Sequence, residues 1–335
     1  MKKLFPLLLI PFLVFSSCKK DKLGCTEPTA CNYDENANKN DGTCISATTW
    51  YQDLDGDTLG NPYETLIACT QPSGYVSNNA DTSGTFDLLV VKKQRATVTY
   101  VGATWCPPCG AYGDPTKEHM EATYGSDVVI LNVQSGDAIS TAGEFGPNFG
   151  NAFQSFVGSN GIPHVYFSGA NVAPTDTMNH RGFYSSNSAN ASAADANINA
   201  ILSDVDVSVG IAASATNSGD SAVTINTKTK FYSALGEHYI GVYLLEDGVM
   251  ANQSISGSPD AITAHNNVIR FSVFPGNSIG TQSIGTEFTA DQEVSGTYTI
   301  PLWAGWNSSN LQVAVVIWNS TQADGISNSI IVDVN

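Results

Sequence analysis

The chain of 335 residues carries little charge, and positive charge is especially scarce. Charged residues make up 13% of it, and 14 Lys and Arg stand against 31 Asp and Glu, for a net charge of −17. Proteins that bind nucleic acid neutralise phosphates with basic patches, so this shortage argues against nucleic acid as a partner. The hydrophobic fraction of 42% is that of a globular protein, and the length allows two or more domains.

The apolar run near the N-terminus is too short to cross a membrane. It covers residues 4–15, follows Met1-Lys2-Lys3, and is itself followed by small residues and Cys18. This order is that of a bacterial lipoprotein signal, which predicts a signal peptide over residues 1–17 and a lipidated Cys18. An ordinary signal peptide with a chance cysteine is the alternative. Lipidated Cys18 would tether the protein to a membrane, outside the cytoplasm, at the outer membrane or cell surface.

The sequence has no second pair of zinc ligands after Cys106 and Cys109. These cysteines are separated by two residues, but no further Cys pair and no His pair with zinc spacing follows them. A zinc site usually needs four such ligands, so zinc is disfavoured. A redox-active pair and an inert structural disulfide remain as the alternatives, and the spacing favours the redox pair.

The residues before the pair favour the redox interpretation. Thr97 to Val101 form a β-branched run that predicts a buried strand, and Cys106 then falls where a helix begins. The positive end of a helix dipole lowers the pKa of a thiol, so Cys106 is the expected nucleophile and Cys109 the resolving thiol. Pro107 and Pro108 have no N–H, so the Cys109 N–H is the nearest backbone donor left for the thiolate.

Trp105 to Cys109, taken together with Pro163, resemble the thioredoxin superfamily. The resemblance implies a cis peptide bond between Ile162 and Pro163 that lies against an accessible Cys106 sulfur. It assigns catalytic roles to Cys106, Cys109 and Pro163. It also implies an active-site surface made of Trp105, Pro107, Pro108 and Ile162.

This sequence departs from that family in its acidic residues. Thioredoxin has a buried acid six residues before the first cysteine, where this chain has Tyr100. Membrane-tethered relatives have a Glu six residues after it, where this chain has Tyr112. The sequence therefore shows no carboxylate that would shuttle protons.

Four further cysteines lie in the N-terminal segment of an exported protein, which predicts two structural disulfides. Three connectivities are open, and the residues concerned are Cys25, Cys31, Cys44 and Cys69. The surrounding phrase, from Gly24 to Cys44, resembles a short repeat of Bacteroidetes surface proteins.

An acidic stretch after this repeat predicts either a calcium site or a solvated turn. Asp53, Asp55, Asp57 and Glu64 have the spacing of positions 1, 3, 5 and 12 of an EF-hand loop. Thr58 stands at position 6, where that loop prefers Gly. The stretch also resembles the calcium repeats of thrombospondin type 3. Such calcium would be structural, and no cofactor is expected for catalysis.

Downstream of residue 82 the hydrophobic pattern changes once. Strands alternate with helices up to residue 203, with a helix interrupted at 110–113, restarted at Asp114 and ended by Gly125. From 204 onward the pattern alternates with period two, which predicts an antiparallel β-sandwich. The predicted division is a signal peptide over 1–17, a tether and Cys-rich repeat over 18–49, a calcium-type motif and linker over 50–82, an α/β thioredoxin-like domain over 83–203, and an all-β sandwich over 204–335.

Together these features resemble the outer-membrane-protein-28-related family of Bacteroidetes. We predict a membrane-anchored, extracytoplasmic thiol–disulfide oxidoreductase that uses Cys106 and Cys109. Its partners would be protein thiols or disulfides and an unidentified electron donor. The alternative is a non-enzymatic surface lipoprotein whose sandwich binds a glycan or a protein.

Overall fold

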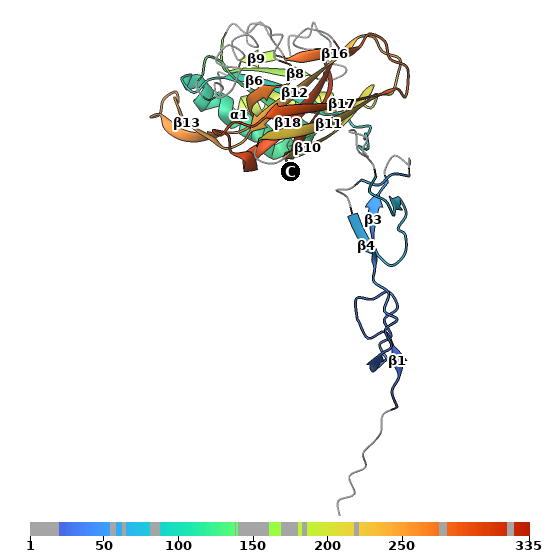
Figure 1. Ribbon diagram of the computed structural model, residues 1–335. Helices are drawn as coiled ribbons and strands as arrows, with labels where there is room; N and C mark the ends of the chain where they lie inside the picture. The colour runs from blue at the N-terminus through green and yellow to red at the C-terminus, as the bar shows by residue number, and fades with distance from the viewer. Residues whose placement is uncertain are drawn as a thin grey trace, which may run out of the picture. The chain divides into compact units, whose positions relative to one another are not determined.

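The computed structural model consists of two compact units, one up to Asp81 and one from Thr82 to Asn335, and each is considered by itself. The elements are labelled in Figure 1. Among the residues described below, no helix is long and apolar enough to cross a membrane. The structure describes residues 20–53, 58–61, 65–80, 88–137, 139, 161–168, 180–182, 186–217, 221–274, 280–319 and 325–335.

Disulfides cross-link the first unit. Cys25 is bonded to Cys44 and Cys31 to Cys69, which confirms two bridges and selects one of the three connectivities. Cys25 is the one buried apolar side chain among the described residues of this unit, so the bridges replace a core. Two small sheets surround them: β1 (Leu23–Gly24) pairs with β2 (Lys39–Asn40), and β3 (Thr48–Gln52) lies between β4 (Thr65–Ala68) and β5 (Tyr75–Val76).

A mixed sheet with helices on one face begins the second unit. β6 (Ala96–Gly102) and β7 (Val128–Gln134) are buried along their whole length and run parallel, as expected for strands covered on both faces. β8 (His164–Ser168) pairs antiparallel with β6, and β9 (His180–Gly182) with β8. The helices α1 (Asp114–Tyr124) and α3 (Asn187–Leu202) contribute to the core on one face of these strands.

The helix that follows the cysteine pair continues through the glycines at 110–113. Residues Cys109–Gly113 form one π-helical turn, η1, and α1 follows directly, so the predicted interruption is wrong. Pro115 gives the reason. Its ring would collide with the carbonyl four residues earlier in a regular α-helix, and a wider turn removes that collision. Gly125 ends α1 with a φ of +49°, as the sequence predicts.

The same sheet continues into strands from the C-terminal part of the chain. The strand order is β19-β18-β12-β15-β7-β6-β8-β9, and β16 pairs with β12 beside β15. The junction is small, because β15 and β7 run parallel and share the single pair Val268↔Asn132. The added strands are β12 (His238–Glu246), β15 (Val268–Ser272), β16 (Thr281–Gly285), β18 (Leu311–Trp318) and β19 (Ile326–Asp333).

Two apolar cores lie on the two faces of β12 and β18. Val242 and Val315 face a separate sheet of three strands, β10 (Val209–Asn217), β11 (Ala222–Phe231) and β17 (Glu293–Pro301). Tyr243 and Trp318 belong to another cluster, which also contains side chains of β6, β7 and β8. The large sheet therefore bends so that its two halves face each other across this second cluster.

The coarse fold prediction is confirmed, with a mixed α/β sheet, antiparallel strands downstream of it and a disulfide-rich N-terminal segment. The division into domains over 83–203 and 204–335 stays a prediction. In the structure, strands from both ranges share one sheet within the second unit.

Candidate active site

The cysteine pair lies just beyond the C-terminal end of β6, at the start of the helical segment that leads into α1. A disulfide joins Cys106 to Cys109. The Cys109 N–H donates to the Cys106 carbonyl O at 3.0 Å and lies 3.2 Å from the Cys106 Sγ. That contact confirms the expectation that this amide is the backbone donor nearest the sulfur, since Pro107 and Pro108 have none.

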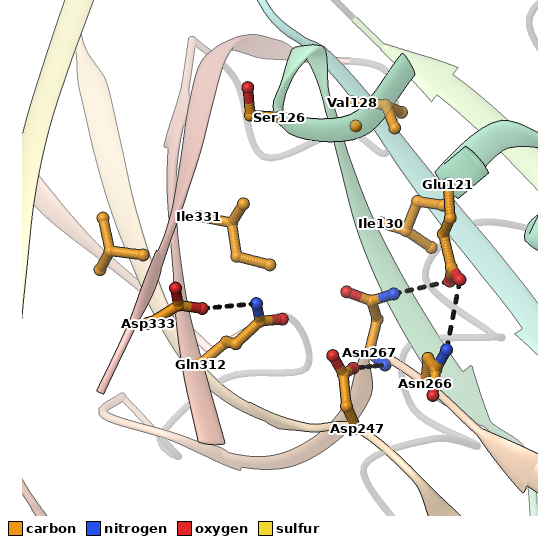
Figure 2. A pocket seen from close by; sticks show the side chains of 12 residues that line it. Glu121, Ser126, Val128, Ile130, Asp247, Asn266, Asn267, Gln312, Ile331 and Asp333 are labelled. Carbon is orange, nitrogen blue, oxygen red and sulfur yellow. Dashed lines mark hydrogen bonds between the residues drawn. The ribbon is translucent and has the colours of Figure 1, made fainter. Parts of the chain in front are cut away.

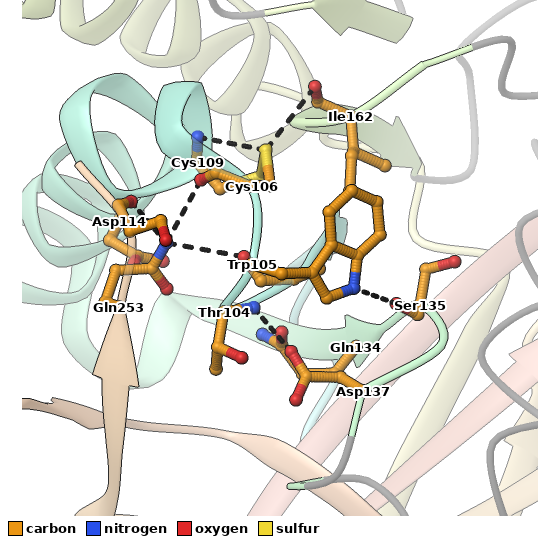
Figure 3. The surroundings of a disulfide bond; sticks show 12 residues. Thr104, Trp105, Cys106, Cys109, Asp114, Gln134, Ser135, Asp137, Ile162 and Gln253 are labelled. Atoms are coloured by element: carbon orange, nitrogen blue, oxygen red, sulfur yellow. Dashed lines mark hydrogen bonds between the residues drawn. A yellow bond between two sulfur atoms is a disulfide. The ribbon is translucent and has the colours of Figure 1, made fainter. Parts of the chain in front are cut away.

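The predicted cis bond lies against the pair. Ile162-Pro163 is cis, and the Ile162 carbonyl O is 3.7 Å from the Cys106 Sγ (Figure 3). Pro163 is buried, and a Cβ placed on Gly113 would come within 2.9 Å of its Cβ, so this loop packs closely on η1. The fold thus brings together Cys106, Cys109 and Pro163, which are far apart in sequence.

The expectation of an accessible sulfur is wrong for the structure as it stands. Cys106 is 3% exposed and Cys109 1%, whereas Trp105 beside them is 58% exposed. Pro107 is exposed, and Pro108 and Ile162 are partly buried. The pair is therefore covered locally while its rim remains open.

A segment that the sequence does not single out contacts the loop that holds the pair. Strands β13 (Val249–Gln253) and β14 (Ala261–His265) form a hairpin, and residues 253–256, here called the strap, run along the loop that holds the pair. Ser254 N–H donates to the Thr104 carbonyl at 2.8 Å, and Ser256 N–H donates to the Pro107 carbonyl at 2.9 Å. Gln253 Nε2 donates to the carbonyls of Ala103 and Cys106, at 3.3 and 3.1 Å.

Two carboxylates that the sequence does not assign to the site lie near the pair (Figure 3). Asp137 is 3% exposed and accepts the Thr104 N–H. Asp114 accepts a hydrogen bond from the Tyr100 hydroxyl at 3.2 Å, with the buried Lys117 ammonium 4.0 Å away. Burial, and then the Asp114 carboxylate, raises the pKa of Tyr100 well above its ordinary value, so Tyr100 stays a neutral donor.

The remaining predicted site residues belong to the first unit. Cys18, Asp55, Asp57 and Glu64 are outside the described residues. Asp53 is described, and its carboxylate accepts the Thr58 N–H at 3.1 Å. Where the structure describes the chain, no three His, Cys, Asp or Glu side chains form a group that could hold a metal ion.

A separate polar pocket of about 360 Å³ lies away from the predicted site residues (Figure 2). Its wall includes Glu121, which accepts hydrogen bonds from Asn267 at 2.7 Å and Asn266 at 3.4 Å. Burial raises the pKa of Glu121 despite these donors. Asp333 on the facing strand accepts from Gln312 at 2.8 Å. Both carboxylates are held by side-chain amides of the protein itself, so a structural role explains their presence in the pocket.

Comparison with known proteins assigns the family. Residues 151–333, more than half of the chain, match the family described as outer membrane protein Omp28. The chain belongs to this family. Membership confirms the predicted localisation at the outer membrane, while lipidation of Cys18 stays a prediction. The matched region begins after Cys106 and Cys109, so membership of the Omp28 family does not rest on the cysteine pair.

One solved structure supports the architecture of this Omp28-family chain, and a second is similar over a smaller part. HBP35 of Porphyromonas gingivalis superimposes with a TM-score of 0.55 at 12% identity, covering 72% of this chain and 76% of that one. A domain of the outer membrane lipoprotein Omp28 from the same organism gives a TM-score of 0.27 at 19% identity, covering 39% of this chain and 90% of that one. No curated protein matches the sequence.

Proposed function

We propose that this protein is a thiol–disulfide oxidoreductase of the outer membrane with a thioredoxin-like domain. One observation carries the proposal: the Cys106 sulfur lies 3.7 Å from the carbonyl of a cis Ile162-Pro163 bond, at the start of a helical segment. The parallel pair β6–β7, the antiparallel β8 and β9, and the helices on one face support it.

The reaction follows from the order of the two cysteines. In the reduced pair, the Cys106 thiolate attacks a substrate disulfide, forms a mixed disulfide and releases the first substrate thiolate. The Cys109 thiolate then attacks the Cys106 sulfur, which releases the second substrate thiolate and leaves the pair oxidised. A dithiol donor returns two electrons to the pair. The substrates are protein thiols or disulfides, and the reduction potentials of the partners set the direction of transfer.

Replacing Cys106 with serine is expected to reduce catalysis of insulin reduction by dithiothreitol to the uncatalysed rate. The full chain in detergent serves as the enzyme, and precipitation of the insulin B chain is measured. Cys109→Ser is the matched variant: it retains the attacking sulfur but not the resolving one, and is expected to accumulate a mixed disulfide with insulin. Equal rates for the wild type and Cys106→Ser would contradict the proposal and favour a non-enzymatic surface protein that binds a glycan or a protein.

A structural calcium ion is proposed in the first unit. The Thr58 φ of +71° is the left-handed conformation for which an EF-hand loop uses Gly at this position. Calorimetric titration of the full chain with Ca²⁺ is expected to show binding that Asp53→Asn weakens at least about tenfold, because a charged ligand is lost. Asp41→Asn, which changes a carboxylate bound to Thr43 instead, should leave the affinity unchanged. Absence of binding to the wild type would contradict the proposal.

A further inference from the structure

The strap contacts the active-site loop in the manner of an extended chain. Alternate residues, Ser254 and Ser256, donate their N–H groups to carbonyls of the loop that holds the cysteines. This spacing of two is the one with which an extended peptide pairs with a neighbouring backbone. The carbonyls that accept belong to Thr104 and Pro107, on either side of Cys106.

Close packing makes this contact tight. A Cβ placed on Gly110 would lie 2.6 Å from the Ser254 carbonyl O and 2.7 Å from the Gln253 Cγ, so only a glycine fits beneath the strap. Gln253 is 2% exposed, and its amide reaches the Cys106 carbonyl from 147 positions along the sequence. The first helical turn is thus covered by a distant part of the chain.

The strap also has features of a segment that opens locally. Residues 257–260 after it are exposed, and Gly257 has a φ of +77°. The Ser254 hydroxyl bonds only the exposed Asp260, at 3.2 Å, among its contacts in the described chain. Two backbone hydrogen bonds and the buried Gln253 amide fasten the strap, and loss of these few bonds is enough for the segment to open locally.

We propose that the strap controls access to the cysteine pair and thereby selects its substrates. This proposal rests on the oxidoreductase function proposed above. With the strap in place, the carbonyls of Thr104 and Pro107 on either side of Cys106 are occupied. A substrate reaches the sulfur when the strap leaves the loop, which frees the carbonyls of Thr104 and Pro107 to bind an extended, disulfide-bearing segment of the partner. The strap therefore favours partners that present a cysteine in an unfolded or extended stretch.

The test measures how fast dithiothreitol reduces the Cys106–Cys109 disulfide in the oxidised full chain. Free thiols are trapped with iodoacetamide at intervals and assigned by mass spectrometry. The double variant Ser254→Pro/Ser256→Pro removes both backbone donors and is expected to be reduced about tenfold faster. Ser254→Ala/Ser256→Ala keeps both donors and is expected to stay within about twofold of the wild type. The Cys25–Cys44 disulfide is the internal reference and should react at an unchanged rate.

An equal rate for the proline variant and the wild type overturns the proposal. If circular dichroism shows that the proline variant is unfolded, Gln253→Leu gives the decision, since it removes the side-chain fastening and is also expected to accelerate reduction. The outcome is separate from the insulin assay. Faster reduction of the pair in the proline variant, without insulin turnover by the wild type, would support control by the strap and contradict the oxidoreductase function. Insulin turnover by the wild type, with an unaltered reduction rate in the proline variant, would support the oxidoreductase function and contradict control by the strap.

Discussion

Trp318→Ala is expected to lower the free energy of unfolding of the second unit by about 3–5 kcal/mol, the usual cost of removing a large buried aromatic side chain. Trp318 is fully buried, in the cluster that contains side chains from both halves of the bent sheet. Because the halves share this cluster, we expect them to lose stability together. Urea unfolding would be followed by two probes. Far-ultraviolet circular dichroism reports on the sheet as a whole, and the rate of reduction of the Cys106–Cys109 disulfide reports on the half that carries the cysteines.

Trp303→Ala is the matched control, because Trp303 is 45% exposed. Its effect should stay within about 0.5 kcal/mol, as for most surface substitutions. Two separate transitions, with the cysteine region unaffected by Trp318→Ala, would contradict the shared core. They would instead support independent domains over 83–203 and 204–335.

Arg270→Met is expected to lower the free energy of unfolding by about 3–5 kcal/mol, because it leaves a buried carboxylate without its counter-ion. Arg270 Nε lies 3.1 Å from Glu246 Oε2, and their side chains are 6% and 8% exposed. Arg270 also donates to the Ile139 carbonyl, and Glu246 accepts the Asn307 N–H at 2.8 Å. The pair therefore fastens β12 and β15 to two loops.

The double variant Arg270→Met/Glu246→Gln should recover most of this loss, since Gln carries no charge and still accepts the Asn307 N–H. Lys230→Met is the surface control. Lys230 contacts the partly exposed Glu293 at 3.4 Å, and its loss should cost under about 1 kcal/mol. If Arg270→Met is no worse than Lys230→Met in urea titrations, the buried pair does not stabilise the fold as argued.

Local pattern predicts most of the strands but not how they assemble. The alternating residues of β11 and β17 and the apolar runs of β12 and β18 are visible in the sequence, because one or both faces of each strand are buried. The junction of β7 with β15 has no such signal. It rests on one residue pair between segments 136 positions apart.

The candidate site shows the same limit. The positions of Cys106, Cys109 and Pro163 follow from short motifs, and the structure brings them together. The position of the strap does not follow from a motif, because apolar and polar residues do not alternate in the sequence of β13 and the contacts with the loop are long-range. The sequence predicts that Asp114 starts a new helix, but the π turn joins it to the preceding helical segment, and its carboxylate accepts a hydrogen bond from the Tyr100 hydroxyl.

The small junction between β7 and β15 has a practical consequence for producing pieces of this protein. The Omp28 match begins at residue 151, after both β6 and β7. A fragment cut at that boundary would leave one backbone edge of β8 without β6 and one edge of β15 without β7. Unpaired edges recruit other chains and aggregate. The first residue of the family match is therefore a poor place to begin an expressed fragment. A soluble fragment has to start ahead of Ala96, the first residue of β6.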